Sequence, residues 1–277
     1  NDTVHSTLEV NGARQVGKTY IINKFADENF RHKIYINLFD LSGKQFMECY
    51  KKATELDSQV QNEPEQPLHD AFKLFDPDFE DTNDTVIIID EIQESSEIFN
   101  RIREFTRYFQ AHFIVTGSYL GRVLEPEFKF SSGDITSIRI YTLSFKEFLE
   151  ALDDQLFQKY LSLPLDHADD TVPELYDELK NVYDIYRQIG GYPKVVETYL
   201  NTKDVEAAQK ELVRIIRIFL NESMRYFDDI TDISVFTNIF LSICRILLRE
   251  KKGLDEDSIS EELQKLVTKN YSSNLSK

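Results

Sequence analysis

The chain has 277 residues, 41% of them apolar, so it is long enough for about two domains of roughly 150 residues and apolar enough to build cores. With 49 acidic against 32 basic residues, its formal net charge of −17 repels polyanions over most of the surface and argues against broad nucleic-acid binding. Since no run approaches the ~20 apolar residues that span a bilayer and no signal sequence opens the chain, we expect a cytoplasmic protein without membrane contact.

The first half of the chain alternates short β-type runs with helical periodicity, which is typical of βαβ units and a parallel sheet. The expected strands are residues 7–10, 33–38, 86–89, 112–115 and 135–141. One helix is expected along an apolar stripe made of Ile98, Phe99, Ile102, Phe105 and Phe109. The acidic, proline-containing segments 59–67 and 76–84 are expected as surface loops on either side of a short helix.

After about residue 150 the β signal disappears and helical periods dominate. A helix is predicted to begin at Ser144, because Ser144 and Glu147 have the spacing of a capping box. Further helices are expected at residues 174–189, 194–200, 205–225, 235–249 and 258–267. We therefore predict three parts: a sheet domain of residues 1–150, a helical part of residues 151–230 and an incomplete C-terminal segment of residues 231–277.

The segment NGARQVGKTYIINKF, residues 11–25, contains the pattern G-x-x-x-x-G-K-[ST] between an expected strand and an expected helix that carries Ile21, Ile22 and Phe25 on one face. In that setting backbone N–H groups at a helix N-terminus converge on phosphates. Lys18 would reach the β- and γ-phosphates, and the Thr19 hydroxyl would bind Mg²⁺. The predicted nucleotide-binding residues are Gly12, Ala13, Arg14, Gln15, Val16, Gly17, Lys18, Thr19 and Tyr20. The alternative is a glycine turn before a helix, with a chance Lys-Thr pair.

The segment VIIIDEIQ, residues 86–93, predicts a strand buried on both faces and followed by two carboxylates. Ligands of open parallel sheets lie at this end of the strands. Asp90 would hold Mg²⁺, directly or through water, and Glu91 would act as the catalytic base that accepts a proton from the attacking water. An apolar run followed by Asp is common by itself, but the adjoining Glu91 and the preceding phosphate-binding pattern favour the functional interpretation.

A third apolar strand, in HFIVTGS at residues 112–118, ends in two hydroxyl side chains. Thr116 or Ser118 could orient a water molecule or touch the γ-phosphate, and we predict Ser118 as a nucleotide contact. The alternative is a plain turn after a strand, for which Thr-Gly-Ser is also suited.

These three segments together resemble the AAA+ branch of the P-loop ATPases. The chain is similar in particular to a family of bacterial and archaeal AAA ATP-binding proteins with the signatures RQVGKT, IIDEIQ, TGSYLG, LSFKEFL and GGYP, over most of residues 7–250. The resemblance implies an α/β fold, a P-loop NTPase of AAA+ type with a parallel five-stranded sheet flanked by helices. It also implies an all-α lid, a partial winged-helix-like segment, ATP and Mg²⁺ as cofactors, an unidentified protein client and compatibility with a homo-oligomer.

The resemblance also gives a meaning to GGYP at residues 190–193. In lid domains of related ATPases a Gly-x-Pro element contacts the nucleotide, which implies that Pro193 touches the base and Lys194 the phosphates. The alternative is purely structural, a helix terminator followed by a helix that begins at proline. Both interpretations remain open from the sequence.

One position departs from the family pattern. Relatives often carry a Gly-Arg pair before the last strand, where this chain has Gly133 and Asp134. Arg122 and Arg139 remain candidates for the cation that stabilises the transferring phosphate, in cis or from a neighbouring subunit. The alternative for each is an ordinary surface arginine.

The expected function is an ATP-hydrolysing conformational switch, with nucleotide between the sheet domain and the lid and with water as the phosphoryl acceptor. Three alternatives remain: a nucleotide-binding regulatory module with little hydrolysis, a small-molecule phosphotransferase, and a DNA-binding protein with an ancillary ATPase. Glu91 speaks against a pure binder, which needs no carboxylate there. The acidic charge and the incomplete C-terminal segment speak against nucleic acid as a partner.

Overall fold

The structure is a computed structural model, and it describes residues 6–57, 66–117, 133–163, 173–223 and 233–249. The chain divides into two compact units, residues 1–211 and 212–277. The three-part division at residues 150 and 230 stays a prediction.

The described part of the first unit contains a five-stranded sheet in the order β2-β3-β4-β1-β5, with every neighbouring pair parallel. The strands are β1 (Thr7–Asn11), β2 (His32–Asn37), β3 (Thr85–Asp90), β4 (His112–Thr116) and β5 (Ile135–Arg139). Each expected strand is therefore present, with ends that differ by at most two residues. The predicted α/β fold with a parallel five-stranded sheet is confirmed.

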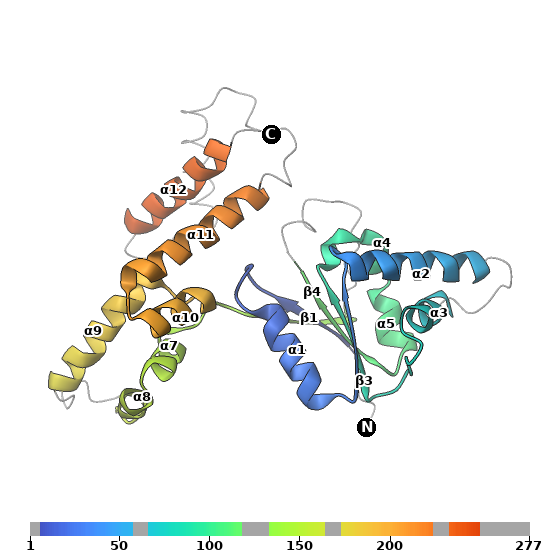
Figure 1. The fold of residues 1–277 in the computed structure, drawn as a ribbon, viewed down its shortest axis with the longest axis horizontal. Coiled ribbons are helices and arrows are strands. Elements are labelled where there is room, and N and C mark those ends of the chain that lie inside the picture. The colour runs from blue at the N-terminus through green and yellow to red at the C-terminus, as the bar shows by residue number, and fades with distance from the viewer. Residues whose placement is uncertain (1–5, 58–65, 118–132, 164–172, 224–232, 250–277) are drawn as a thin grey trace. The chain divides into compact units, whose positions relative to one another are not determined.

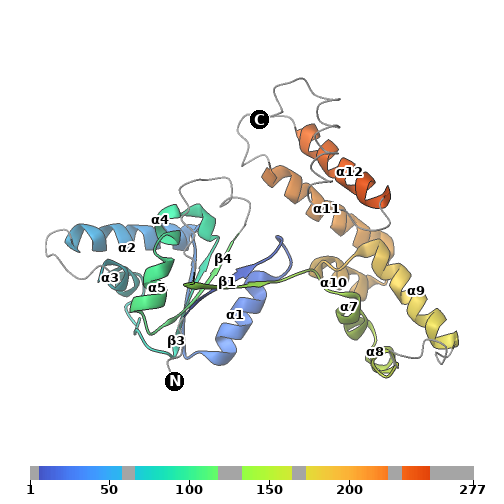
Figure 2. The ribbon, with the colours of Figure 1, turned by 180° about the vertical axis from the view of Figure 1, so that it is seen from behind.

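Helices cover both faces of this sheet (Figures 1 and 2). One face carries α1 (Lys18–Asn29), and the other carries α2 (Leu41–Asp57), α3 (Gln66–Phe75) and α5 (Ile102–Tyr108). Because side chains alternate along a strand, Val86 and Ile88 of β3 enter the cluster under α1, whereas Ile87 and Ile89 enter the cluster on the opposite face. All six residues of β3 are buried, as the sequence predicted for this strand.

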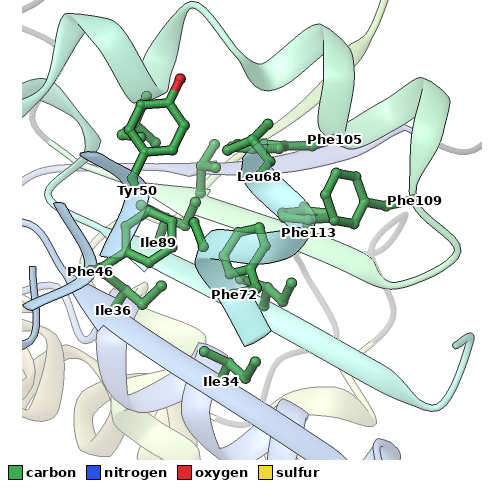
Figure 3. Close-up of a cluster of buried hydrophobic side chains, with 14 of the residues drawn as sticks. Ile34, Ile36, Phe46, Tyr50, Leu68, Phe72, Ile89, Phe105, Phe109 and Phe113 are labelled. Carbon is green, nitrogen blue, oxygen red and sulfur yellow. The ribbon is translucent and has the colours of Figure 1, made fainter. Parts of the chain in front are cut away.

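The larger of the two clusters that pack on the sheet, on the face opposite α1, is rich in aromatic side chains (Figure 3). Phe72 of α3 stacks on Phe46 of α2 with ring centroids 5.0 Å apart, and Phe105 of α5 stacks on Phe113 of β4 at 4.4 Å. The first contact holds α2 and α3 together, and the second holds α5 on the sheet.

Two local expectations are corrected by the structure. The apolar stripe of residues 98–109 is buried as expected, but it lies on two short helices, α4 (Ser96–Phe99) and α5, rather than on one. The break is a tight turn in which the Arg101 N–H donates to the Ile98 carbonyl at 3.0 Å. On α1, Ile22 and Ala26 form the buried face, whereas Ile21 and Phe25 are 44% and 47% exposed.

The remaining described elements are helical. In chain order they are η1 (Ile92–Glu94), α7 (Phe145–Leu152), α8 (Asp154–Leu161), α9 (Pro173–Ile189), α10 (Pro193–Thr202), α11 (Val205–Ser223) and α12 (Ile233–Arg249). The capping box is present at α7, where the Glu147 N–H donates to the Ser144 hydroxyl and the Glu147 carboxylate accepts from the Ser144 N–H. The short helix α8 was not expected, and the expected helix at residues 258–267 lies outside the described residues.

The loop expectations are met in part. Helix α3 begins at Gln66, so it includes the end of the first acidic segment, residues 59–67. The second segment, residues 76–84, connects α3 to β3 without helix or strand. The predicted winged-helix-like segment lies mostly outside the described residues, and only α12 of it is described.

Candidate functional site

The three motifs singled out in the sequence meet at one edge of the sheet. Because the strands are parallel, the segments that follow β1, β3 and β4 all leave at the carboxyl edge. Strand β4 lies between β1 and β3, so the Thr116 end is flanked by the loop after β1 and by the carboxylates at the end of β3. Tertiary structure therefore brings together residues that are about a hundred positions apart.

The loop between β1 and α1 is shaped by glycines and one buried side chain. Gly12 has φ of +150°, and a Cβ there would lie 2.3 Å from the carbonyl oxygen of Ile140, so only glycine fits. Val16 is buried and anchors the middle of the loop. Gly17, with φ of +92°, is the left-handed N-cap of α1, and Gln15 also has a positive φ of 61°. The loop thus turns sharply into the helix that begins at Lys18.

Lys18 lies back over this loop. Its Nζ donates to the carbonyl oxygens of Gly12 and Ala13, each at 2.9 Å. The ammonium charge is therefore held near the N-terminus of α1, where the helix dipole and the first N–H groups also favour an anion. This arrangement is compatible with a phosphate chain, and the contact of Lys18 with phosphate stays a prediction.

Asp90, at the end of β3, is 5% exposed and accepts hydrogen bonds on both carboxylate oxygens. Its Oδ2 accepts from the Thr19 hydroxyl at 2.9 Å and from the Tyr35 hydroxyl at 2.7 Å. Its Oδ1 accepts from the Glu91 N–H at 2.9 Å. The two predicted Mg²⁺ ligands, Thr19 and Asp90, are thus in direct contact.

Tyr35 was not singled out in the sequence. Burial, followed by the hydrogen bond to Asp90 and the negative charge of that carboxylate, raises the pKa of Tyr35 above its ordinary value, so the hydroxyl keeps its proton and acts as a donor. In the sequence, the one indication of this role is a tyrosine hydroxyl within the strand KIYIN. A hydroxyl in a strand does not reveal which residue it will contact.

Glu91 is held on both sides of its carboxylate. Its backbone is left-handed, with φ of 54° and ψ of 45°, which is strained for a residue other than glycine. The Arg14 guanidinium lies 3.5 Å from Oε1, and the Gln93 side-chain amide donates to Oε2. The predicted base is therefore connected to the loop after β1 through Arg14 and to η1 through Gln93, a residue that the sequence reasoning missed.

Thr116 presents a buried hydroxyl at the end of β4. The residue is 1% exposed, and its Oγ1 has no hydrogen-bond partner within the described part of the chain. The next residue, Gly117, packs so closely on Gln93 that a Cβ would lie 2.2 Å from its Oε1. A buried hydroxyl without a partner is costly, so its place between Asp90 and the loop after β1 is consistent with a ligand that would complete it.

Two predicted site residues, Ser118 and Arg122, lie outside the described residues. Tyr20 lies on α1 and is 71% exposed. Arg139, also exposed, ends β5 at the carboxyl edge, where it pairs in register with Asn11. The roles of all four residues stay predictions.

The GGYP segment connects two helices of the helical part. The Leu143 N–H donates to the Gly191 carbonyl at 2.7 Å, and a Cβ at Gly191 would lie 1.9 Å from the Leu143 carbonyl oxygen. Gly190, with φ of +72°, follows α9, and Pro193 opens α10. These contacts give the segment a structural role, while the contact of Pro193 with a nucleotide stays a prediction.

Asp134, where the chain departs from the Gly-Arg pair of the family pattern, lies at the amino edge of the sheet. Asp134 precedes β5, at the amino ends of the strands, and is 9% exposed. Its carboxylate lies 3.3 Å from Arg107 and 4.0 Å from Arg103, both on α5. In this chain the position therefore holds a structural ion pair at the edge away from the loop after β1.

Two kinds of feature are absent from the described ranges, a cluster of metal ligands and a membrane-spanning helix. No cluster of three or more His, Cys, Asp or Glu side chains that could hold a metal occurs among the residues described. Magnesium needs no such cluster, because it is commonly held by one or two protein oxygens together with substrate phosphates. No helix in the described part of the chain has the length and apolar character needed to cross a membrane.

Comparisons with known proteins agree with the fold. A model of the AAA domain family matches residues 5–149, which is more than half of the chain. No curated protein matches this chain. Similar solved structures include ORC1 of Aeropyrum pernix in complex with DNA, which is 16% identical with a TM-score of 0.32 over 95% of this chain and 72% of that one.

Two further solved structures are similar at the same level. PCH-2 of C. elegans is 13% identical with a TM-score of 0.39, over 77% of this chain and 62% of that one. The Drosophila ORC bound to DNA is 14% identical with a TM-score of 0.33, over 95% and 81%. Likeness at this level says nothing about ligands or partners, so the family assignment depends on the family model alone. By that match the chain belongs to the AAA domain family of P-loop ATPases.

Proposed function

We propose that the protein binds ATP with Mg²⁺ at the carboxyl edge of the sheet and hydrolyses it, with water as the acceptor, as a conformational switch. Membership of the AAA domain family supports a nucleotide-binding function of the ATPase type. The single observation that carries the proposal is the contact of Thr19 with Asp90 at 2.9 Å, beside the Lys18 ammonium at the start of the same helix.

In this proposal the phosphates are bound by the Lys18 ammonium and by the N–H groups at the start of α1. The Thr19 hydroxyl and the Asp90 carboxylate would hold Mg²⁺, whose chemical contribution when bound is to neutralise charge on the phosphates. The Thr19 hydroxyl can go on donating its hydrogen bond to Asp90 Oδ2 and still has oxygen lone pairs that could bind the metal. The residues present therefore fit the ligand without rearrangement of this pair.

Glu91 is the proposed proton acceptor for the attacking water. Its carboxylate is 22% exposed and held by Arg14 and Gln93, so it is reachable but oriented. The Thr116 hydroxyl, which has no partner among the described residues, is the proposed donor to the γ-phosphate or to that water. Arg14, which lies in the loop after β1, would also be available to the phosphates.

The second candidate is a nucleotide-binding regulatory module with little hydrolysis. The observation that favours it is the tethering of Glu91, because the contacts with Arg14 and Gln93 already engage both oxygens of the carboxylate that would accept the proton. Binding and hydrolysis must therefore be tested separately. We further propose a protein client and self-association, and no nucleic-acid partner, given the charge of −17.

Binding is tested by titrating wild type and Lys18→Ala with a fluorescent ATP analogue in Mg²⁺. Because a hydrogen bond to a charged group contributes ~1.5–3 kcal/mol, Lys18→Ala should weaken binding about tenfold to a hundredfold. Lys24→Ala is the matched control, since Lys24 lies on the same helix, is 60% exposed and forms an ion pair with Glu28 at 4.0 Å. Absence of binding by wild type would overturn the proposed function.

A further inference from the structure

Asp90 receives more hydrogen bonds than the proposed Mg²⁺ site itself requires. Thr19, Tyr35 and the Glu91 N–H all donate to its carboxylate. A carboxylate offers about four lone-pair sites, so these donors leave about one for a metal ion or a metal-bound water. The direction in which Asp90 can bind a cation is therefore set by its donors, and Tyr35 gives the shortest of the three contacts.

Tyr35 is itself held by the sheet. It lies on the edge strand β2, paired in register with Ile88, and the next residues of β2 pair up to Asn37 opposite Asp90. Its ring packs against the apolar cluster under α1. The Leu38 N–H, just after β2, donates to the Asp90 carbonyl at 3.0 Å. Strand β2 thus fixes both the backbone and the carboxylate of Asp90.

We propose that Tyr35 is a positioning residue of the Mg²⁺ site, which holds the Asp90 carboxylate in the orientation that binds the metal. The inference rests on the proposed function, and it extends the site to a strand that none of the three motifs includes. Tyr35 acts through Asp90 and touches neither nucleotide nor metal. Groups behind a metal ligand typically change metal affinity about tenfold to a hundredfold when they are removed.

A merely structural role for the hydroxyl makes a different prediction. If Tyr35 only satisfies a buried carboxylate, its removal lowers the melting temperature and leaves the Mg²⁺ requirement unchanged. If it orients Asp90, the Mg²⁺ requirement rises while nucleotide binding without metal stays the same. The dependence on Mg²⁺ therefore separates the two roles.

The test is Tyr35→Phe, which removes one oxygen atom and keeps the ring. Binding of a fluorescent ATP analogue is titrated with Mg²⁺, and binding of Mn²⁺ to the protein–ATP complex is followed by electron paramagnetic resonance. We expect the half-saturating Mg²⁺ concentration to rise at least about tenfold, with nucleotide affinity in EDTA within twofold of wild type. Tyr186→Phe is the matched control, because its hydroxyl donates to the Leu143 carbonyl at 2.9 Å and should leave the Mg²⁺ dependence unchanged.

Thermal melting shows whether each variant is folded. Tyr35→Leu, which also lacks the hydroxyl, is the second variant and should shift the Mg²⁺ dependence in the same direction. An unchanged Mg²⁺ dependence in a folded hydroxyl-free variant would overturn the inference and leave the proposed function standing. If wild type bound the ATP analogue equally with Mg²⁺ and with EDTA, the proposed Mg²⁺ site itself would fail, and the inference with it.

Discussion

Polar groups pair with one another at both edges of the sheet, but the carboxyl edge also holds strained backbones and a buried hydroxyl without a partner among the described residues. Asp134 pairs with Arg107 at 3.3 Å, and His32 contacts Asp76 at 3.1 Å. At the carboxyl edge, by contrast, Gln15 and Glu91 have left-handed backbones and the Thr116 hydroxyl lacks a partner among the described residues.

This difference supports the proposal that the ligand binds at the carboxyl edge. The same sheet supports both edges, so the strain and the unpaired hydroxyl do not follow from the fold in general. Strained backbones and unsatisfied buried groups persist where the surrounding structure holds them, and they are commonly found at binding sites. The first three of the following substitutions each alter one edge, and the other edge serves as the reference; the fourth lies outside both edges.

The largest effect is expected for Gly12→Ala. The added Cβ would lie 2.3 Å from a backbone oxygen, so the loop must shift. Misplacement by about 1 Å can cost about a hundredfold, and we expect ATP affinity to fall at least that much in a fluorescence titration. Gly133→Ala is the control at the amino edge, because Gly133 also has a positive φ, +96°, but open space around its Cβ position. Equal losses of affinity in both variants would contradict the comparison.

Thr116→Val should separate activity from stability. The substitution keeps the shape and removes a buried hydroxyl that has no partner in the described part of the chain, so the free energy of unfolding should rise by about 1 kcal/mol. Loss of a donor to a charged phosphate should slow phosphate release about tenfold to a hundredfold. Chemical denaturation and a phosphate-release assay measure the two quantities. A variant that is less stable and fully active would show that the hydroxyl has a structural partner instead.

Arg107→Ala should affect stability alone. Arg107 is about half exposed, so its pair with Asp134 is worth no more than about 1 kcal/mol of the free energy of unfolding. ATP affinity should stay within twofold of wild type. A folded Arg107→Ala variant with much weaker ATP binding would connect the amino edge to the site and break the distinction between the edges.

The smallest effect is expected at the capping box of α7. The hydrogen bonds from the Ser144 N–H and from the Ser144 hydroxyl, which the substitution removes, lower the pKa of Glu147. This carboxylate therefore stabilises the fold above the ordinary pKa of glutamate, and the contribution is lost as the pH falls through the lowered value. Ser144→Ala should lower the free energy of unfolding by ~0.5–2 kcal/mol at pH 7. Denaturation curves at pH 7 and pH 3 should show a smaller difference between variant and wild type at the lower pH. A difference that grew at pH 3 would be inconsistent with this sign.

The sequence predicts those parts of the site that depend on local spacing. Gly12, Gly17, Lys18 and Thr19 are fixed by one short pattern, and the strand before Asp90 by its apolar run. The five strands follow from short runs rich in β-branched residues, of which β3 is buried throughout and β5 is mostly exposed. Each of these features is encoded within about ten neighbouring residues.

The remaining features depend on contacts between distant segments. Tyr35 and Gln93 join the site only because β2 pairs with β3 and because the end of β4 packs on η1. The break between α4 and α5 follows from a tight turn that the apolar stripe does not reveal. The edge at which Asp134 lies follows from its place before β5 in a parallel sheet. Register and packing, rather than composition, decide these points.

The most direct test of the central claim is phosphate release in a single turnover, for wild type and for Glu91→Gln. The substitution keeps the shape of the side chain and removes its capacity to accept the proton. If the carboxyl edge hydrolyses ATP with Glu91 as the base, the variant should bind ATP with Mg²⁺ about as tightly as wild type and release phosphate at least about a hundredfold more slowly. Release at the wild-type rate by Glu91→Gln would contradict the account.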